Sequence, residues 1–173
     1  MKELPVRKNI RLKGYDYSNA GYYFVTICVK DGHELLWNET PVGAHIVRPL
    51  SDIGMVTKKS IENITEIYSN VIVDKYTIMP NHVHMILRIE NGGRTMCAPT
   101  SHVSNMIKQC KEYVTKQIGF SIWQRSYHDH IIRDKAEYQK IWKYIDQNPT
   151  RWTEDCYYNK TKGKTTNPTK PML

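Results

Sequence analysis

Several hallmarks of common protein classes are missing from this sequence of 173 residues. Its four cysteines are widely scattered and form no CxxC pair, which argues against a zinc ribbon or a thioredoxin-type redox site. No apolar stretch approaches the length needed to cross a bilayer, and the first residues, MKELP, contain no hydrophobic leader. We therefore expect a cytoplasmic protein with reduced thiols and no membrane partner.

Acidic residues are also in the minority. The chain has 25 Lys and Arg against 17 Asp and Glu, which gives a formal net charge of +8 and a pI of about 9.3. Such a balance is compatible with a polyanionic partner such as nucleic acid, and equally with a basic protein that binds none. Phenylalanine is scarce, with two residues, whereas tyrosine has 12. Tyrosine keeps one polar edge and can stack on nucleic-acid bases.

The order of the predicted elements is typical of an α+β sandwich. β-Branched and aromatic runs predict strands, whereas apolar residues at helical spacing predict helices. Strands are expected over 22–30, 71–79, 82–89 and 122–132, with an edge strand over 44–50, and helices run from the cap at 51–52 to about 68, from about 100 to 119, and over 134–148. This order predicts a ferredoxin-like split βαβ sandwich, an antiparallel sheet with helices on one face, plus a C-terminal helix.

The domain boundary is expected just before the Lys-, Thr- and Asn-rich end of the chain. Residues 1–152 are predicted to form one domain, whereas residues 153–173 form a basic polar tail with little to bury. A segment that cannot bury enough apolar surface to offset its ordering entropy stays flexible, and we expect this of the tail.

The most informative motif is a pair of histidines inside an apolar run, IMPNHVHMI. Side chains two positions apart in a strand point to the same face of the sheet. His82 and His84 are therefore predicted to project side by side, with Val83 in the opposite layer. Two imidazoles on one face form half of a metal site, although paired histidines often serve only as hydrogen-bonded or surface residues.

The predicted helix over 134–148 carries a second set of candidate side chains. Asp134 and Glu137 have the spacing of a capping box, and Pro149 ends the helix. Tyr144 and Asn148 are four residues apart and share one helix face. A tyrosine hydroxyl is a possible nucleophile, and an asparagine oxygen is a possible cation ligand. On pattern alone, core packing is the favoured explanation of the tyrosine, and a polar helix end before Pro149 is the favoured explanation of the asparagine.

Three blocks in the same order, MPNHVHMIL, WQRSYHDHIIRD and KYIDQNP, resemble the HUH single-tyrosine transposases over about residues 10–150. Within them the chain is most similar to the REP-associated tyrosine transposases. The resemblance implies that His82 and His84 bind a divalent cation, Mg²⁺ or Mn²⁺, that Tyr144 is the nucleophile, and that Asn148 completes the metal site. Gln147 is a weaker candidate for that third ligand. Tyr138 and Tyr127 are rival nucleophiles.

The family resemblance also implies the reaction and the partner. A metal-dependent single-stranded DNA transposase and endonuclease would cleave and rejoin DNA through a 5′-phosphotyrosine, on single-stranded or hairpin, REP-like DNA. It would act as a monomer or homodimer, with each site built in cis or in trans. His128 and His130 form a second HxH pair without a metal role in the family, and we expect His130 to be structural. Candidate DNA-binding residues are Arg88, Arg94, Lys108, Arg125, Arg133, Lys140 and Lys143.

Alternative functions remain compatible with the same fold. A nucleic-acid-binding module without cleavage, such as a degenerate transposase, would keep the sandwich and lose the chemistry. An RNA-recognition domain is disfavoured because its aromatic GFGFVxF pattern is missing from the sequence. A nucleotide hydrolase of the histidine-triad kind needs HxHxH, but the third position here is Ile86.

Overall fold

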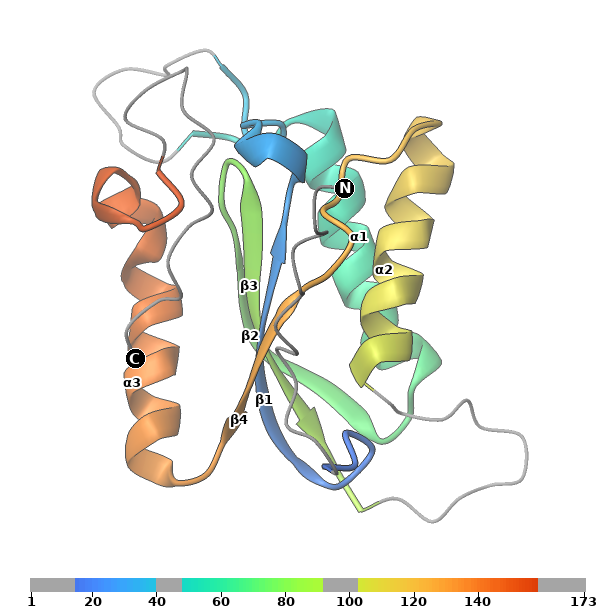
Figure 1. Cartoon of the computed structure of the whole chain (residues 1–173), viewed down its shortest axis with the longest axis vertical. Helices are drawn as coiled ribbons and strands as arrows, with labels where there is room; N and C mark the ends of the chain where they lie inside the picture. Colours follow the sequence, from blue (N-terminus) through green and yellow to red (C-terminus); the bar gives the residue numbers. More distant parts are fainter. Residues whose placement is uncertain (1–14, 40–47, 92–102, 159–173) are drawn as a thin grey trace, which may run out of the picture.

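The computed structural model describes residues 15–39, 48–91 and 103–158 (Figure 1). Strands and helices follow in the predicted order. Their bounds are β1 Gly21–Cys28, η1 Lys30–Gly32, α1 Asp52–Ile67, β2 Val71–Ile78, β3 His82–Ile89, α2 Val103–Ile118, β4 His128–Ile132, α3 Lys135–Gln147 and η2 Asn148–Glu154. The predicted α+β class is confirmed.

The four strands form one antiparallel sheet in the order β2-β3-β1-β4. Because β3 lies between β1 and β2 and runs antiparallel to both, β1 and β2 are parallel and α1 connects them across the sheet. This is the split βαβ arrangement that the sequence predicted. The register between β1 and β3 places Thr26 opposite His84 and Cys28 opposite His82. Both histidines therefore lie near one end of the two central strands.

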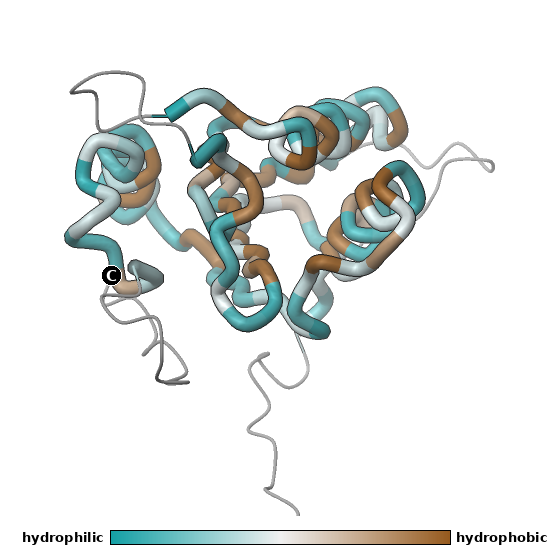
Figure 2. The backbone as a smooth tube through the Cα atoms, turned by 90° about the horizontal axis from the view of Figure 1, so that it is seen from above, coloured by the Kyte–Doolittle hydropathy of each residue, from teal (hydrophilic) through white to brown (hydrophobic). Residues whose placement is uncertain are grey.

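Helices α1 and α2 cover one face of the sheet. Alternate strand residues, among them Val25 on β1 and Val83 on β3, are buried against these two helices. The apolar stripe predicted for α2 is buried along its whole length, from Val103 to Val114. Figure 2 shows the apolar sides of the helices turned toward the sheet. The larger part of the core lies in this layer.

Helix α3 covers the opposite face of the sheet (Figure 1). Ile141 and Ile145 are fully buried against Phe24 of β1, Ile86 of β3 and Ile132 of β4. Ile86 has the same strand parity as His82 and His84, so the histidines face α3. The sequence predicted this added helix, and the structure shows that it forms a second, smaller apolar layer.

Capping residues set the ends of the helices as predicted. The Ser51 side chain accepts a hydrogen bond from the Gly54 backbone N–H at 3.0 Å, and the Asp134 side chain accepts from that of Glu137 at 2.8 Å. Pro149 follows the end of α3, where the chain continues as the 3-10 helix η2. None of the helices in the described ranges is long and apolar enough to cross a membrane.

Two predicted strands differ from the structure. In the run 122–132, only His128–Ile132 forms a strand, while Trp123 makes an isolated bridge with Val29. Most of the predicted edge strand over 44–50 lies outside the described residues, and Leu50 at its end makes an isolated bridge with Trp37. Val29, Trp37 and Trp123 are buried at these bridges, outside the strands of the sheet.

Gly54 allows α1 to begin close to the preceding loop. A Cβ atom at this position would lie 2.1 Å from the carbonyl oxygen of Leu36, which already accepts a hydrogen bond from Ser51. Because the obstructing atom belongs to the backbone, Gly54→Ala should cost about 2 to 4 kcal/mol in the free energy of unfolding, measured with urea. The neighbouring Met55→Ala, on a side chain that is 54% exposed, serves as the control and should change it by less than about 0.5 kcal/mol. Equal effects of the two substitutions would contradict the close contact.

Candidate functional site

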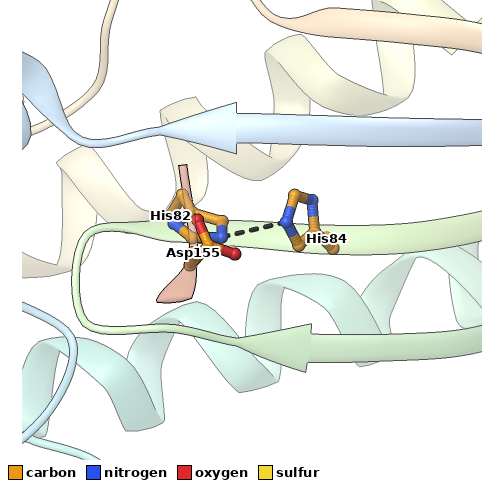
Figure 3. A group of neighbouring side chains, drawn as sticks. All are labelled: His82, His84 and Asp155. Atoms are coloured by element: carbon orange, nitrogen blue, oxygen red, sulfur yellow. Dashed lines mark hydrogen bonds between the residues drawn. The ribbon is translucent and has the colours of Figure 1, made fainter. Parts of the chain in front are cut away.

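The two histidines of β3 point toward each other beneath α3. Their Nε2 atoms are 3.0 Å apart, and neither ring has exposed surface. Figure 3 shows the rings converging from the same strand, with the carboxylate of Asp155 beside them. The predicted side-by-side placement of His82 and His84 is confirmed, with Val83 in the opposite layer.

The other ring nitrogens of both histidines are held by hydrogen bonds. His82 Nδ1 lies 2.8 Å from Oδ1 of Asn81, and His84 Nδ1 lies 2.8 Å from the hydroxyl of Thr26. Such outer partners fix the orientation of an imidazole and leave its second nitrogen for a ligand. In this site the remaining nitrogens are the two Nε2 atoms, which point toward each other.

Burial keeps the two imidazoles neutral. It lowers the pKa of His82 from 6.5 to about 3. It also lowers the pKa of His84 well below its usual value, assisted by the neighbouring His82 and opposed by Asp155. A neutral imidazole retains the lone pair that a cation needs.

The buried pair should make the metal-free protein sensitive to mild acid. Below pH 6.5, these two histidines take up protons in the unfolded chain, whereas the buried rings of the folded chain stay neutral. Because the unfolded state then binds more protons, the free energy of unfolding decreases as the pH is lowered. In a chelator, the free energy of unfolding should drop by about 2 to 3 kcal/mol between about pH 7.5 and about pH 5.5. Urea unfolding of His82→Gln should show roughly half of this pH dependence. If the free energy of unfolding of that variant depended on pH as strongly as that of the unmodified chain, the effect could not be assigned to the buried histidines.

Tyr144 extends from α3 to the histidine pair. Its hydroxyl lies 3.2 Å from Nε2 of His84 and donates to Oδ2 of Asp155 at 3.3 Å. Burial, followed by the negative charge of Asp155, raises the pKa of Tyr144 above its ordinary value. The phenol therefore keeps its proton at neutral pH, and any nucleophilic role needs an acceptor for that proton.

The two rival tyrosines lie elsewhere. Tyr138, on the same helix, donates its hydroxyl to Asp74 at 3.3 Å and packs edge-on against Tyr22. Tyr127 is buried with the α1 and α2 layer, on the other face of the sheet from the histidines. Of the three candidate nucleophiles, Tyr144 is therefore the one that the fold brings to His84.

Asn148 and Gln147 differ in their placement at the end of α3. Asn148 is buried, whereas Gln147 is exposed. The side-chain amide of Asn148 makes no hydrogen bond of good geometry in the part of the chain that the structure describes, although it lies near enough to Tyr144 to favour ionisation of the phenol. Buried amide atoms are almost always paired, so an unpaired one needs an explanation. A bound cation would satisfy the amide oxygen.

Asp155 is a site residue that sequence reasoning missed. A carboxylate oxygen of Asp155 and one nitrogen from each of His82 and His84 lie within 4.8 Å of one another. Its Oδ1 atom accepts a hydrogen bond from the backbone N–H of Tyr157 at 2.7 Å, which holds the carboxylate in place. Asp155 could supply a ligand oxygen or accept the proton of Tyr144.

The predicted boundary after residue 152 divides this site. Tyr157 is buried, and its ring centroid lies 4.4 Å from that of His82. Trp152 is buried in the same cluster, with Cys28, Trp37 and Met79. The polar composition of residues 153–173 gave no indication of these contacts. Two aromatic residues in a polar stretch are nevertheless enough to cover an apolar surface that the rest of the domain provides. Residues 159–173 of the predicted tail lie outside the described residues.

The predicted DNA-binding residues are spread over both layers. Arg133, Lys140 and Lys143 are exposed at or on α3, the helix that carries Tyr144. Arg88 pairs with Asp74 and Glu90. Lys108 and Arg125 are exposed on the α1 and α2 side, where Lys108 pairs with Glu112. Arg94 lies outside the described residues.

The second HxH pair has a different environment. His130 Nε2 lies 2.6 Å from Oε1 of Glu137, and the other carboxylate oxygen of Glu137 accepts from the backbone N–H of Arg133 at 2.8 Å. These bonds join β4 to the first turn of α3. They fit the structural role expected for His130.

Comparison with known proteins identifies the family of this chain. The model of the family described as "Transposase IS200 like" matches residues 49–148. An uncharacterised protein of Haemophilus influenzae is 33% identical, covering 88% of this chain and 93% of the relative. A second protein of that organism, provisionally named a REP-associated tyrosine transposase, is 22% identical over 79% of this chain and 74% of its own. This chain belongs to the IS200-like family of HUH tyrosine transposases.

A solved structure shares the fold. A REP-associated tyrosine transposase bound to a REP hairpin superimposes with a TM-score of 0.59 at 19% identity, covering 88% of this chain and 74% of the other. At this identity the match establishes the common architecture of sheet and helices. The family assignment rests on the sequence match.

Proposed function

We propose that this chain is a metal-dependent single-stranded DNA transposase that cleaves and rejoins strands through a 5′-phosphotyrosine at Tyr144. The observation that carries the proposal is the position of the Tyr144 hydroxyl, 3.2 Å from Nε2 of a fully buried, neutral His84. Family membership supports the reaction class. The structural neighbour is bound to a REP hairpin, which supports a hairpin as the form of DNA to be recognised.

The donor set fits a divalent cation, Mg²⁺ or Mn²⁺. His82 and His84 offer two converging Nε2 atoms, and the unpaired amide of Asn148 and the carboxylate of Asp155 offer oxygen. Imidazole combined with oxygen ligands suits these ions, with Mn²⁺ the more tolerant of nitrogen. A bound cation would polarise the scissile phosphate as a Lewis acid.

The remaining chemistry belongs to Tyr144 and its neighbours. The phenol oxygen attacks phosphorus, the bond from phosphorus to the 3′-oxygen breaks, and the departing oxygen takes a proton to become a 3′-hydroxyl. The phenol proton must leave, and Asp155 Oδ2, at 3.3 Å, is the acceptor that remains when His84 Nε2 is engaged as a ligand. Because the phosphodiester energy is kept in the tyrosine ester, rejoining needs no nucleotide cofactor.

Access to this site requires movement of its cover. Neither histidine has exposed surface, and Tyr157 lies directly against His82. We expect residues 155–158 to shift when DNA binds. Arg133, Lys140 and Lys143, which are exposed at or on α3, provide positive charge for the phosphate backbone.

The test is a cleavage assay with end-labelled DNA. The full chain is incubated with single-stranded hairpin DNA, drawn from the sequence flanking its gene, with Mn²⁺ or with a chelator. A 3′ label should become attached to the protein in a denaturant-resistant adduct, whereas a 5′ label should appear on a free fragment ending in a 3′-hydroxyl. Tight binding without any adduct would support the binding-only alternative, and a protein-bound 5′ label would contradict the stated polarity.

A further inference from the structure

Asn81 occupies the turn between β2 and β3, immediately before the first metal-ligand candidate. It is a buried polar residue, with 3% of its surface exposed. Its side-chain Nδ2 donates to the carbonyl oxygen of Tyr157 at 2.9 Å and to that of Gly32 at 3.3 Å. Carbonyl oxygens only accept, so the amino group must face them. The amide oxygen Oδ1 therefore faces His82.

The orientation of Asn81 determines which nitrogen of His82 carries the proton. Oδ1 lies 2.8 Å from His82 Nδ1 and can only accept, so Nδ1 must be the donor. In a neutral ring this leaves the lone pair on Nε2, which faces His84. In the metal-free chain His84 Nε2, 3.0 Å away, is then the donor to His82, and the Thr26 hydroxyl donates to Nδ1 of His84.

We propose that Asn81 is a positioning residue that fixes His82 in the Nδ1–H form and so presents its Nε2 lone pair to the cation. The inference rests on the metal site of the proposed function. It adds a connection between the metal site and the end of the chain, because the Tyr157 carbonyl holds the Asn81 amide in the required orientation. The segment 155–158 therefore covers His82 and also, through the bond from Asn81 to the Tyr157 carbonyl, helps to hold its ring in the Nδ1–H form.

The first measurement is the protonation pattern of the imidazoles in the metal-free full chain, read from long-range proton–nitrogen NMR correlations. Asn81 predicts a protonated Nδ1 and an unprotonated Nε2 for His82. Observation of Nε2–H on His82 in the unmodified protein overturns the proposal without any variant. Because this experiment contains no metal, its result is independent of whether the chain binds a cation.

Two variants separate orientation from simple packing. Asn81→Ala removes the acceptor, so His82 should populate both neutral forms and Mn²⁺ affinity, measured by calorimetry, should fall by about 10- to 100-fold. Asn81→Asp loses the bonds to the Tyr157 and Gly32 carbonyls but keeps an acceptor beside Nδ1, so it should retain the Nδ1–H form and lose less affinity than Asn81→Ala. An unchanged His82 form together with unchanged Mn²⁺ affinity in Asn81→Ala would overturn the proposal. Failure of the unmodified chain to bind Mn²⁺ would instead count against the metal site itself.

Discussion

Replacement of Tyr144 by Phe is expected to abolish the covalent protein–DNA adduct while leaving DNA binding intact. The substitution removes one hydroxyl and keeps the ring that packs beside Phe24 and His84. No other tyrosine in the described residues has its hydroxyl bonded to either histidine, so nothing replaces the lost nucleophile. Loss of the nucleophile in a covalent mechanism should lower adduct formation by at least about 1,000-fold.

The matched control is Tyr138→Phe on the same helix. It also removes a half-buried hydroxyl that is bonded to an aspartate, but its partner is Asp74 on β2, whereas the hydroxyl of Tyr144 bonds Asp155 beside the histidine pair. We expect this variant to form the adduct at close to the normal rate. Both proteins should bind the labelled hairpin equally, as measured by fluorescence anisotropy. An adduct that persists in Tyr144→Phe and disappears in Tyr138→Phe would assign the nucleophile to Tyr138 and contradict the geometry.

Replacement of His84 by Gln should eliminate metal binding and cleavage together. Nε2 of His84 contacts both Nε2 of His82 and the hydroxyl of Tyr144. The substitution removes this ligand nitrogen and puts an amide group of different length and geometry in its place. We expect Mn²⁺ affinity to fall by about 100-fold or more and the adduct to become undetectable. Binding of Mn²⁺ should raise the melting temperature of the unmodified protein, because a ligand of the native state stabilises it. The same Mn²⁺ concentration should leave the variant unchanged.

His130→Gln is the control for loss of an imidazole from the same sheet. His130 bonds Glu137 at the start of α3, so its loss should lower stability moderately and leave Mn²⁺ affinity unaltered. Equal loss of Mn²⁺ affinity in the two variants would mean that the metal effect reflects general destabilisation. Retention of normal Mn²⁺ affinity in His84→Gln would remove this residue from the metal site.

Local periodicity explains why much of the site could be predicted from the sequence. The period of two in a strand placed His82 and His84 on one face, and the spacing of Tyr144 and Asn148 placed both on one face of α3. The spacing did not show whether that helix face packs against the hairpin of β2 and β3. An apolar stripe indicates that one face of a helix is buried, but not which element it is buried against. The family resemblance supplied this link, and the packing of Ile141 and Ile145 on Ile86 shows how the fold achieves it.

The missed residues lie where sequence signals are weakest. Asp155 and Tyr157 follow a short 3-10 helix with no periodic pattern, inside a stretch whose composition resembles a flexible tail. A usable signal was the density of aromatics in Trp152, Tyr157 and Tyr158, which a solvated tail does not need. Asn81 could not be assigned its role from the sequence, because that role depends on carbonyl groups of Gly32 and Tyr157 that are distant in the sequence.

The proposed chemistry requires that His82 and His84 hold a divalent cation next to Tyr144. The most direct test is a crystal structure of the full chain grown with Mn²⁺, with diffraction recorded near the manganese absorption edge. We expect one strong anomalous peak within bonding distance of Nε2 of both histidines, with oxygen from Asn148 or Asp155 in the same coordination shell. No peak between the two rings at saturating Mn²⁺, or a peak bound elsewhere on the chain, would contradict it.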